Sequence, residues 1–342
     1  MLKKLTHAAL LTGALAFSNG AAAMVDRTLC VFDVVGANGD TYQMMKQYVL
    51  AAQQWGVNFK LKPYTDEALA KGDFMAGHCD AVELFGIATR SILKFPGSLD
   101  MMAALPTYDG LNTAIAALSA PNAAPLMKDG KYENAGIIPG GKVYLFSHDR
   151  NTLDDWEKLA GKRITVISED EQAVEMIKYV GGTVMPASVS TFAGMFNSKS
   201  ADLSYAPGFA YQALEMYKGL GENGGILRYN LGILTFQVTL HHDRFPAEFA
   251  QQSRTWVYDN MWDVGMRVVE QAEAAIPTKY WVDLSADKEA RYNSMFSDVR
   301  QRLYDADKVY SRRMQTMLKT IRCRELPDNA ECTRDTEGGP AI

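Results

Sequence analysis

The stretch "DWEKLAGKRITVISEDE", residues 155–171, decides the fold. A short polar helix is predicted to end at Gly161, and the β-branched run 164–167 that follows at once is typical of a buried strand. Ser168 and three acidic residues then give the usual start of another helix. A strand followed directly by a helix predicts an α/β unit, in which ligands bind beyond the carboxyl ends of the strands.

The same alternation occurs on both sides of this stretch. Before it, the pattern predicts strands and helices in turn, over 28–36, 40–56, 57–64, 65–77 and 79–86. Around and after it, further strands are predicted over 142–148, 183–187 and 201–207, with helices over 172–182 and 190–200. Two α/β units, each with a parallel sheet, are the simplest arrangement of these elements.

The last third of the chain is mostly helical after a long strand over 233–242. Residues 247–275 carry an apolar stripe at helical spacing, made of Phe249, Trp256, Val257, Met261, Val264, Val268 and Ala272. Such a helix would be about 40 Å long, enough to lie across two domains. We therefore expect a two-lobed α/β clamshell: lobe I from 24–144 with 235–260, lobe II from 145–234, and a C-terminal helical region over 261–342.

The N-terminus carries the marks of a secretory signal peptide over residues 1–23. Lys3 and Lys4 precede a short apolar stretch, and Ala21–Ala23 provide a small-residue cleavage site. The net charge of −5 becomes more negative when the two lysines leave, which excludes nucleic acid as a partner. We expect an exported protein that is not embedded in the membrane. Basic residues gather at one helical stretch, Arg312, Arg313, Lys319, Arg322 and Arg324, which we interpret as a solvated helix face.

Four cysteines in an exported chain favour two disulfides: Cys30, Cys79, Cys323 and Cys332. Three pairings are possible. Only a short loop with Pro327 separates Cys323 from Cys332, so a local bond is easy there and would leave Cys30 for Cys79. A metal site is the weaker interpretation, because no CxxC occurs and no histidine lies at ligand spacing.

Catalytic motifs give no support for an enzyme. "GLGENG" (219–224) has the dinucleotide-binding spacing, but it follows a helix and not a strand. His241 and His242 are adjacent in a strand, so they point to opposite faces and cannot chelate one metal together. We expect no cofactor and no metal.

Polar and aromatic residues at strand ends are the candidate ligand contacts. Those near the first unit are Asp33, Asn38 and Glu83, and those near the second are Glu169, Tyr205 and Phe209. Buried carboxylates demand partners, so two acids in the cleft would indicate a ligand with an amine or several hydroxyls. Aromatic walls are common in small-molecule pockets.

Three segments resemble the DctP-like solute-binding proteins of TRAP transporters: "MAGHCDAVELFG" (75–86), "LAGKRITVI" (159–167) and "TFAGMFNSKSADLSYAP" (191–207). In the last of them, Asp202 and Pro207 match the family pattern, while Leu203 replaces a glycine. "TLCVFDVVGANGD" (28–40), "GSLDMMAAL" (97–105) and "IPTKYWVDL" (276–284) are similar to an AdeT-like group of proteobacterial solute-binding proteins. This second resemblance covers nearly the whole mature chain.

The resemblance implies a ligand enclosed between two lobes, with an arginine that grips the ligand's carboxylate from the second-lobe strand. Thr165 occupies that arginine's position, and Arg163 lies two residues earlier on the same side of the strand. Arg90, just past the strand at 79–86, is a candidate replacement for the missing anchor. We therefore leave the ligand open between a carboxylate and a polar or amine compound.

The resemblance also implies a role: periplasmic capture of a small molecule and delivery to the subunits of a membrane permease. Some AdeT-like proteins have been called efflux components, so an accessory role in an efflux system is the alternative. Efflux adaptors need a long heptad-bearing helical hairpin and a β-rich barrel region, and the sequence shows neither.

Overall fold

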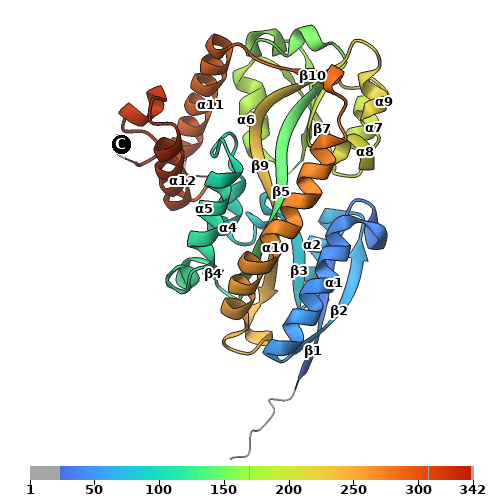
Figure 1. The fold of residues 1–342 in the computed structure, drawn as a ribbon, viewed down its shortest axis with the longest axis vertical. Helices are drawn as coiled ribbons and strands as arrows, with labels where there is room; N and C mark the ends of the chain where they lie inside the picture. The colour runs from blue at the N-terminus through green and yellow to red at the C-terminus, as the bar shows by residue number, and fades with distance from the viewer. Residues whose placement is uncertain (1–23, 169, 307, 340–342) are drawn as a thin grey trace, which may run out of the picture.

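A computed structural model describes residues 24–168, 170–306 and 308–339. The predicted signal peptide at 1–23 and the candidate contact Glu169 therefore lie outside the described residues. One ten-stranded sheet runs through the molecule, in the order β2-β1-β3-β9-β5-β8-β6-β7 (Figure 1). β4 (Lys128–Asp129) pairs with β5 and β10 (Trp281–Val282) pairs with β9.

The first lobe is built on three parallel strands, β1 (Val25–Phe32), β2 (Val57–Tyr64) and β3 (Ala81–Phe85). α1 (Asp40–Ala52) and α2 (Glu67–Met75) connect them. These bounds lie close to the predicted strands at 28–36, 57–64 and 79–86. β1 and β3 are buried at their carboxyl ends, which brings Phe32 and Phe85 to the middle of the molecule.

The second lobe repeats this plan with β6 (Arg163–Ile167), β7 (Thr183–Ala187) and β8 (Leu203–Pro207). Both pairs that β6 makes are parallel. Its helices are α6 (Glu171–Tyr179) and α7 (Phe192–Asn197). The strand and the following helix that residues 155–171 predict are therefore β6 and α6.

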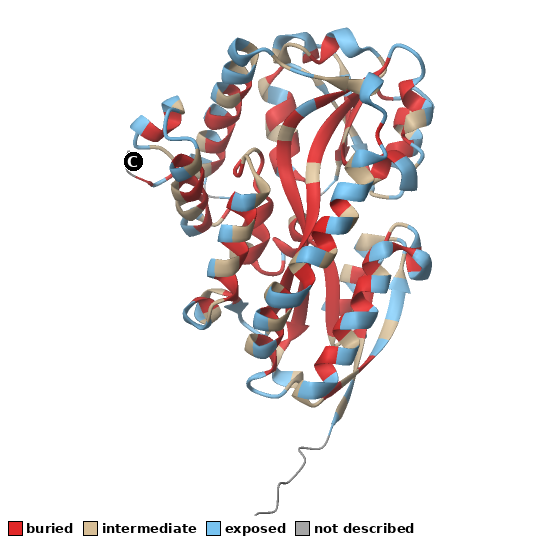
Figure 2. Cartoon of the chain, in the orientation of Figure 1, coloured by how far each residue is buried: buried red, intermediate tan, exposed pale blue. Residues whose placement is uncertain are grey.

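Two long strands join the lobes and correct the prediction of parallel sheets. β5 (Tyr132–Ser147) and β9 (Gly225–His241) are antiparallel to each other, and each pairs antiparallel with a neighbour, β8 and β3 respectively. Both begin earlier than predicted and pass through both lobes, so the sheet is mixed and continuous. Figure 2 shows that they are buried along most of their length.

The pairing of β5 with β9 is irregular where the lobes meet. Its register shifts between Pro139 and Gly141 and again between Val143 and Leu145, and a further shift lies inside the first lobe, between Asn134 and Gly136. Gly141 has a φ of 104°, a left-handed conformation that residues with a Cβ rarely adopt. A bulge of this kind bends a strand locally, so the shared strands are irregular at the level of the cleft.

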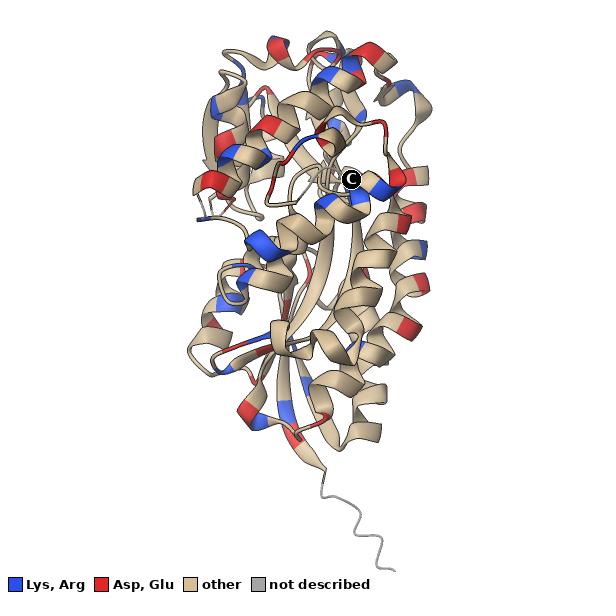
Figure 3. Cartoon of the chain, turned by 90° about the vertical axis from the view of Figure 1, so that its left-hand side faces the viewer, with Lys and Arg blue, Asp and Glu red and all other residues tan. Residues whose placement is uncertain are grey.

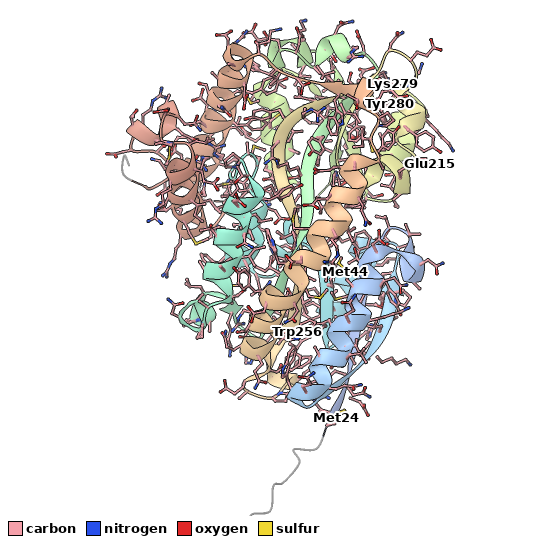
Figure 4. All side chains as sticks on the ribbon, viewed as in Figure 1. Met24, Met44, Glu215, Trp256, Lys279 and Tyr280 are labelled. Atoms are coloured by element: carbon pink, nitrogen blue, oxygen red, sulfur yellow. A yellow bond between two sulfur atoms is a disulfide. The ribbon has the colours of Figure 1, made fainter. Side chains whose placement is uncertain are left out.

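The predicted crossing helix is α10 (Phe249–Ala274), which runs diagonally over the front of Figure 1 from the first lobe towards the second. It packs on β5, on α1 and on α5 (Tyr108–Ser119). Figure 4 shows Trp256 of α10 near α1, where its ring lies 6.4 Å from that of Tyr48. None of the helices in the described residues combines the length and the apolar character needed to cross a membrane.

The C-terminal region consists of α11 (Ala286–Ala306), α12 (Arg312–Glu325) and a tail that returns along α12. Within it, Arg300 and Arg322 each pair with both Glu331 and Glu337, and we call these four residues the C-terminal ion-pair network. Lys319 is also buried and donates to backbone carbonyls of the tail. The predicted solvated face is therefore wrong for Lys319 and Arg322. Elsewhere, Lys and Arg lie among Asp and Glu over the upper part of the molecule in Figure 3.

The cysteines form two disulfides in the pairing that the short loop favoured. Cys30 of β1 is bonded to Cys79, with 5.9 Å between their Cα atoms, and Cys323 of α12 is bonded to Cys332, at 5.5 Å. The first bond ties β1 to the turn that precedes β3. The second holds the tail against α12, next to the C-terminal ion-pair network.

Candidate functional site

Two cavities lie between the lobes, and Phe85 at the end of β3 lines both. The first, of about 70 Å³, borders the crossing helix and is called the α10 cavity; Met44 of α1, labelled in Figure 4, is part of its wall. The second, of about 110 Å³, borders α6 and is called the α6 cavity. The ring centre of Phe85 lies 5.2 Å from that of Phe236 of β9 and 6.5 Å from that of Phe209, a second-lobe residue. These rings hold the lobes in contact beside both cavities.

The α6 cavity has mostly apolar walls supplied by both lobes. From the first lobe come Phe85, Ile87 and Met102, and the shared strands add Val143, Leu231, Ile233 and Leu234. From the second lobe and the C-terminal region come Ile167, Ala173, Met176, Val189, Phe192, Ala206, Pro207 and Phe296. Apolar surface around a few placed polar groups is typical of small-molecule sites.

Two buried carboxyl groups, Asp100 and Asp170, face this cavity from opposite lobes. Asp100 lies in the η3 turn (Ser98–Asp100) and accepts hydrogen bonds from the backbone N and the hydroxyl of Thr235 on β9, at 2.9 and 2.6 Å. Burial raises the pKa of Asp100 to about 7 in spite of these bonds. Asp170 caps α6 and accepts a bond from the Tyr205 hydroxyl at 2.9 Å. Burial raises its pKa as well, against the opposing charge of Arg90.

Side-chain donors at the α6 cavity are already used within the protein. Tyr205 donates to Asp170 and accepts from the backbone N of Ile167. Gln172 of α6 accepts from Met102 N at 3.1 Å and from the Tyr310 hydroxyl, and its amide nitrogen donates to the carbonyl of Asp100. The polar capacity that remains for a ligand is the ability of the Asp100 and Asp170 carboxyl oxygens to accept further hydrogen bonds.

The α10 cavity has a similar character. Its polar lining includes Asp33, Asp40, Thr41 and Glu273, and the rest is largely apolar or glycine. Asp33 accepts from the backbone N of Val35 at 2.8 Å and of Tyr42 at 3.2 Å, so it orders the start of α1, and burial raises its pKa. Glu273 of α10 accepts from the hydroxyls of Tyr108 and Tyr144 at 2.6 and 2.9 Å.

Three of the predicted site residues line the α6 or the α10 cavity, and a fourth, Arg90, lines a separate cavity beside Ile87 and Lys94. Tyr205 lies in the wall of the α6 cavity, whereas Asp33 and Phe209 lie in the wall of the α10 cavity. Their contact with a ligand stays a prediction. Asn38 is exposed in a turn before α1 and belongs to neither of these two walls.

Arg90 lies outside both walls. It follows the short helix α3 (Gly86–Thr89), and its guanidinium group donates to Gly97 O at 3.3 Å and lies 4.9 Å from the Tyr310 ring centre. It is buried, and its Nη2 atom has no hydrogen-bond partner. In this conformation Arg90 provides a buried positive charge behind Asp100 and Asp170.

Thr165 and Arg163 do not replace the arginine of the family pattern. The Thr165 hydroxyl is buried and bonded to Ser204 of β8 at 2.6 Å. Arg163 forms an ion pair with Asp202 at 2.7 Å at the opposite, exposed end of β6. Neither side chain lines the α6 or the α10 cavity.

Glu83 is fully buried in the middle of β3, and neither of its carboxyl oxygens has a hydrogen-bond partner. Burial, with the nearby charges of Glu67 and Asp33, raises its pKa well above the usual value. It is not part of either cavity wall. Burial therefore favours the neutral form of this carboxyl group.

Sequence reasoning missed Asp100, Asp170, Gln172 and Phe85. The sequence pattern predicted a helix start among three adjacent acidic residues, and the structure shows that Asp170 is its N-cap. The strand that Phe85 ends was predicted, but Phe85 itself was not chosen as a site residue. Asp100 and Gln172 carry no local signal, because the long-range pairing of β9 and the packing of α6 bring them to the cavity.

The sequence is similar to a known protein family and to two curated proteins. The model of the family "Solute-binding protein AdeT 1/2" matches residues 50–337. Among curated proteins, "Probable solute-binding protein AdeT1" of Acinetobacter baumannii is 36% identical over 90% of this chain and its own full length. "Probable solute-binding protein AdeT2" of the same species is 22% identical over 69% of this chain and 98% of its own.

Solved TRAP periplasmic solute-binding proteins share the fold. One from Ochrobactrum anthropi has a TM-score of 0.71 at 14% identity, over 91% of this chain and 98% of that one. The succinate-bound protein of Shewanella oneidensis has a TM-score of 0.69 at 12% identity, over 88% and 100%. The ectoine-binding protein of Halomonas elongata has a TM-score of 0.70 at 13% identity, over 87% and 99%. By sequence and by fold, the expected resemblance is confirmed: this chain belongs to the AdeT 1/2 family of solute-binding proteins.

Proposed function

We propose that this protein captures a small molecule between its two lobes in the periplasm and delivers it to the subunits of a TRAP-type or related membrane permease. The observation that carries the proposal is the α6 cavity, which has apolar walls from both lobes and a few buried polar groups. Family membership and the fold of ligand-bound TRAP proteins support the same function. No enzymatic step is part of it.

Closure on the ligand is expected to bend the shared strands. Of the register shifts between β5 and β9, the one between Val143 and Leu145 falls at the boundary of the predicted lobes, 24–144 with 235–260 on one side and 145–234 on the other. A ligand that contacts both lobes stabilises the closed arrangement by its differential affinity for it. The region 261–342 would pack against both lobes and limit the motion to this hinge.

Export to the periplasm is the other half of the proposal. The signal-like segment at 1–23 and the use of all four cysteines in disulfides both favour an oxidising compartment. Mass spectrometry of the protein from its own cells should find the chain shortened after Ala23. A full-length chain in the cytoplasmic fraction would contradict the proposed location.

The central experiment combines native mass spectrometry with thermal unfolding. Protein purified from its own periplasm should carry a co-purified small molecule, and a metabolite panel should contain compounds that raise the melting temperature. At a hundredfold excess over Kd, a ligand stabilises the native state by about 2.7 kcal/mol. If neither experiment reveals a ligand, the binding function is contradicted.

A blocked cavity provides the matched control. Ala173→Phe places a ring into the α6 cavity and should abolish stabilisation by the ligand, whereas Ala274→Phe, on the exposed end of α10, should leave it unchanged. Circular dichroism establishes that both variants fold. Delivery is tested by deleting the gene, which should abolish uptake of the identified ligand; normal uptake would contradict the transport role.

A further inference from the structure

We propose that the ligand of the α6 cavity is an organic amine with an apolar body, and not a carboxylate. The inference rests on the proposed binding function and narrows it to one class of substrate. Three observations carry it: the apolar walls, the buried carboxyl groups that line the cavity from opposite lobes, and the lack of cationic side chains among the described residues of its wall.

The walls and size of the cavity set the body of the ligand. Aliphatic and aromatic side chains make up most of the lining, from Ile87 and Met102 on one side to Met176 and Phe192 on the other. Its volume of about 110 Å³ is of the same order as the ~150 Å³ apolar cavity that accepts a benzene ring. A short alkyl chain or a single ring therefore suits it, and a sugar acid with many hydroxyls would leave polar groups unsatisfied against apolar walls.

The charges of the lining set the polar end of the ligand. The wall contains Glu67, Asp100 and Asp170 but no Lys, Arg or His among the residues that line it. A ligand carboxylate entering here would meet like charge, without a donor to replace its hydration. An ammonium group instead meets carboxyl oxygens that retain acceptor capacity.

The nearest candidates for a carboxylate anchor do not line the α6 cavity. Arg163 pairs with Asp202, and the Thr165 hydroxyl pairs with Ser204. Arg90 lies behind the wall, against Tyr310 and the Gly97 carbonyl. Lys71 lines an adjoining depression together with Asp66 and Glu67, and so does not present a cation to the α6 cavity itself.

Asp100 and Asp170 line the α6 cavity from opposite lobes, so a ligand that binds both would favour the closed state. Asp100 is held by Thr235 of a shared strand, whereas Asp170 caps a second-lobe helix. An ammonium group between them would join the two sides through charge-assisted hydrogen bonds, which are stronger than neutral ones. The same contact would supply the differential affinity for the closed state that the proposed function needs.

The test uses three probes with one apolar body: hexylamine, hexan-1-ol and hexanoate. Thermal unfolding and calorimetric titration are carried out at pH 8, above the pKa of about 7 that burial gives Asp100. Hexylamine should raise the melting temperature and bind, whereas hexanoate should do neither and hexan-1-ol should bind more weakly. 2-Phenylethylamine, 2-phenylethanol and 3-phenylpropanoate repeat the comparison with an aromatic body.

Single substitutions then test whether Asp100 and Asp170 bind the ammonium group of the ligand. Asp170→Asn keeps a good helix cap and removes the charge, and Asp100→Asn keeps an acceptor for Thr235. Each should weaken hexylamine binding by about 10- to 100-fold, the value of a hydrogen bond to a charged group. Asp259→Asn, at an exposed position of α10, is the matched control and should leave binding unchanged.

The outcomes separate the two proposals. Binding of hexanoate or 3-phenylpropanoate in preference to the amines overturns the amine inference and leaves the binding function standing. Equal binding of amine and alcohol also overturns it, as does full affinity in both aspartate variants. If a broad panel that includes all these probes gives no binding, the binding function itself fails.

Discussion

Buried charged side chains have opposite environments in the C-terminal region and around the cleft. In the C-terminal ion-pair network, Arg300, Arg322, Glu331 and Glu337 all have partners, with N–O distances from 2.5 to 3.2 Å. Around the cleft, Glu83 has two unbonded carboxyl oxygens, and Asp100 and Asp170 lack an ion pair within 4 Å among the described residues. Removing one partner from a buried ion pair is strongly destabilising, whereas buried acids with raised pKa values and no direct ion pair are typical of functional sites.

The pKa values follow the same division. Burial would raise the pKa of Glu331, but the guanidinium groups of Arg300 and Arg322 lower it to about 2. Burial dominates at Asp100 and raises its pKa to about 7. The network therefore loses stability only as the pH falls below about 4.5 towards 2, whereas Asp100 reduces stability as the pH rises from about 4 to 7.

The largest effect is expected at the network. Glu331→Gln leaves Arg300 and Arg322 short of one negative charge in a buried site, so the free energy of unfolding should fall by about 3 kcal/mol. Urea unfolding monitored by circular dichroism measures it. A change below about 1 kcal/mol would show that the network is not the stabilising element described above.

The second prediction concerns the slope of stability with pH. For wild type, Asp100 should make the free energy of unfolding fall by up to about 1.4 kcal/mol per pH unit between pH 4 and 7, because the unfolded chain holds fewer protons there. Asp100→Asn should remove this part of the slope. Urea unfolding of both proteins at pH 4.5, 5.5, 6.5 and 7.5 measures the difference, and parallel curves would contradict it.

How far the sequence could have foreseen this contrast depends on the range of each contact. Strand-end positions are local, so Asp33, Tyr205 and Phe209 were predicted and do line the cavities. Glu331 and Glu337 reach Arg300 and Arg322 only because the tail returns along α12, and no periodicity encodes that return. The fold class was predictable because the strands and helices of each α/β unit follow one another along the chain, so that local patterns indicate them. The mixed sheet was not, because β5 pairs with a strand that begins far along the chain.

The third prediction applies the same chemical change to the cleft. Glu83→Gln removes no hydrogen bond from the carboxyl oxygens and no ion pair, and it removes a group whose ionised form is penalised by burial. The free energy of unfolding at pH 7 should stay unchanged or rise by about 1 kcal/mol. A loss as large as that of Glu331→Gln would mean that both buried glutamates are stabilising, and the contrast would be lost.

The smallest effect is expected at an exposed pair. Lys218 and Glu215 form an ion pair on the surface, with about half of each side chain exposed. Lys218→Met should change the free energy of unfolding by less than about 0.5 kcal/mol, because solvent screens the charges. The same urea titration measures it, and a value near that of Glu331→Gln would show that pairing alone, and not burial, sets the effect.

The two shared strands have a mechanical consequence. β5 and β9 remain hydrogen-bonded to each other along a path that crosses from one lobe to the other. The lobes therefore cannot swing as separate bodies on a flexible linker; any opening must bend a paired ribbon, and bending stores elastic energy. The ladder is irregular at three places, and one of them, at 139–141, includes Gly141 with a φ of 104°; strands bend most easily at such irregularities. The stiffness of this paired ribbon, and with it the free energy that a ligand must supply for closure, therefore depends on how easily β5 and β9 bend at these irregular points.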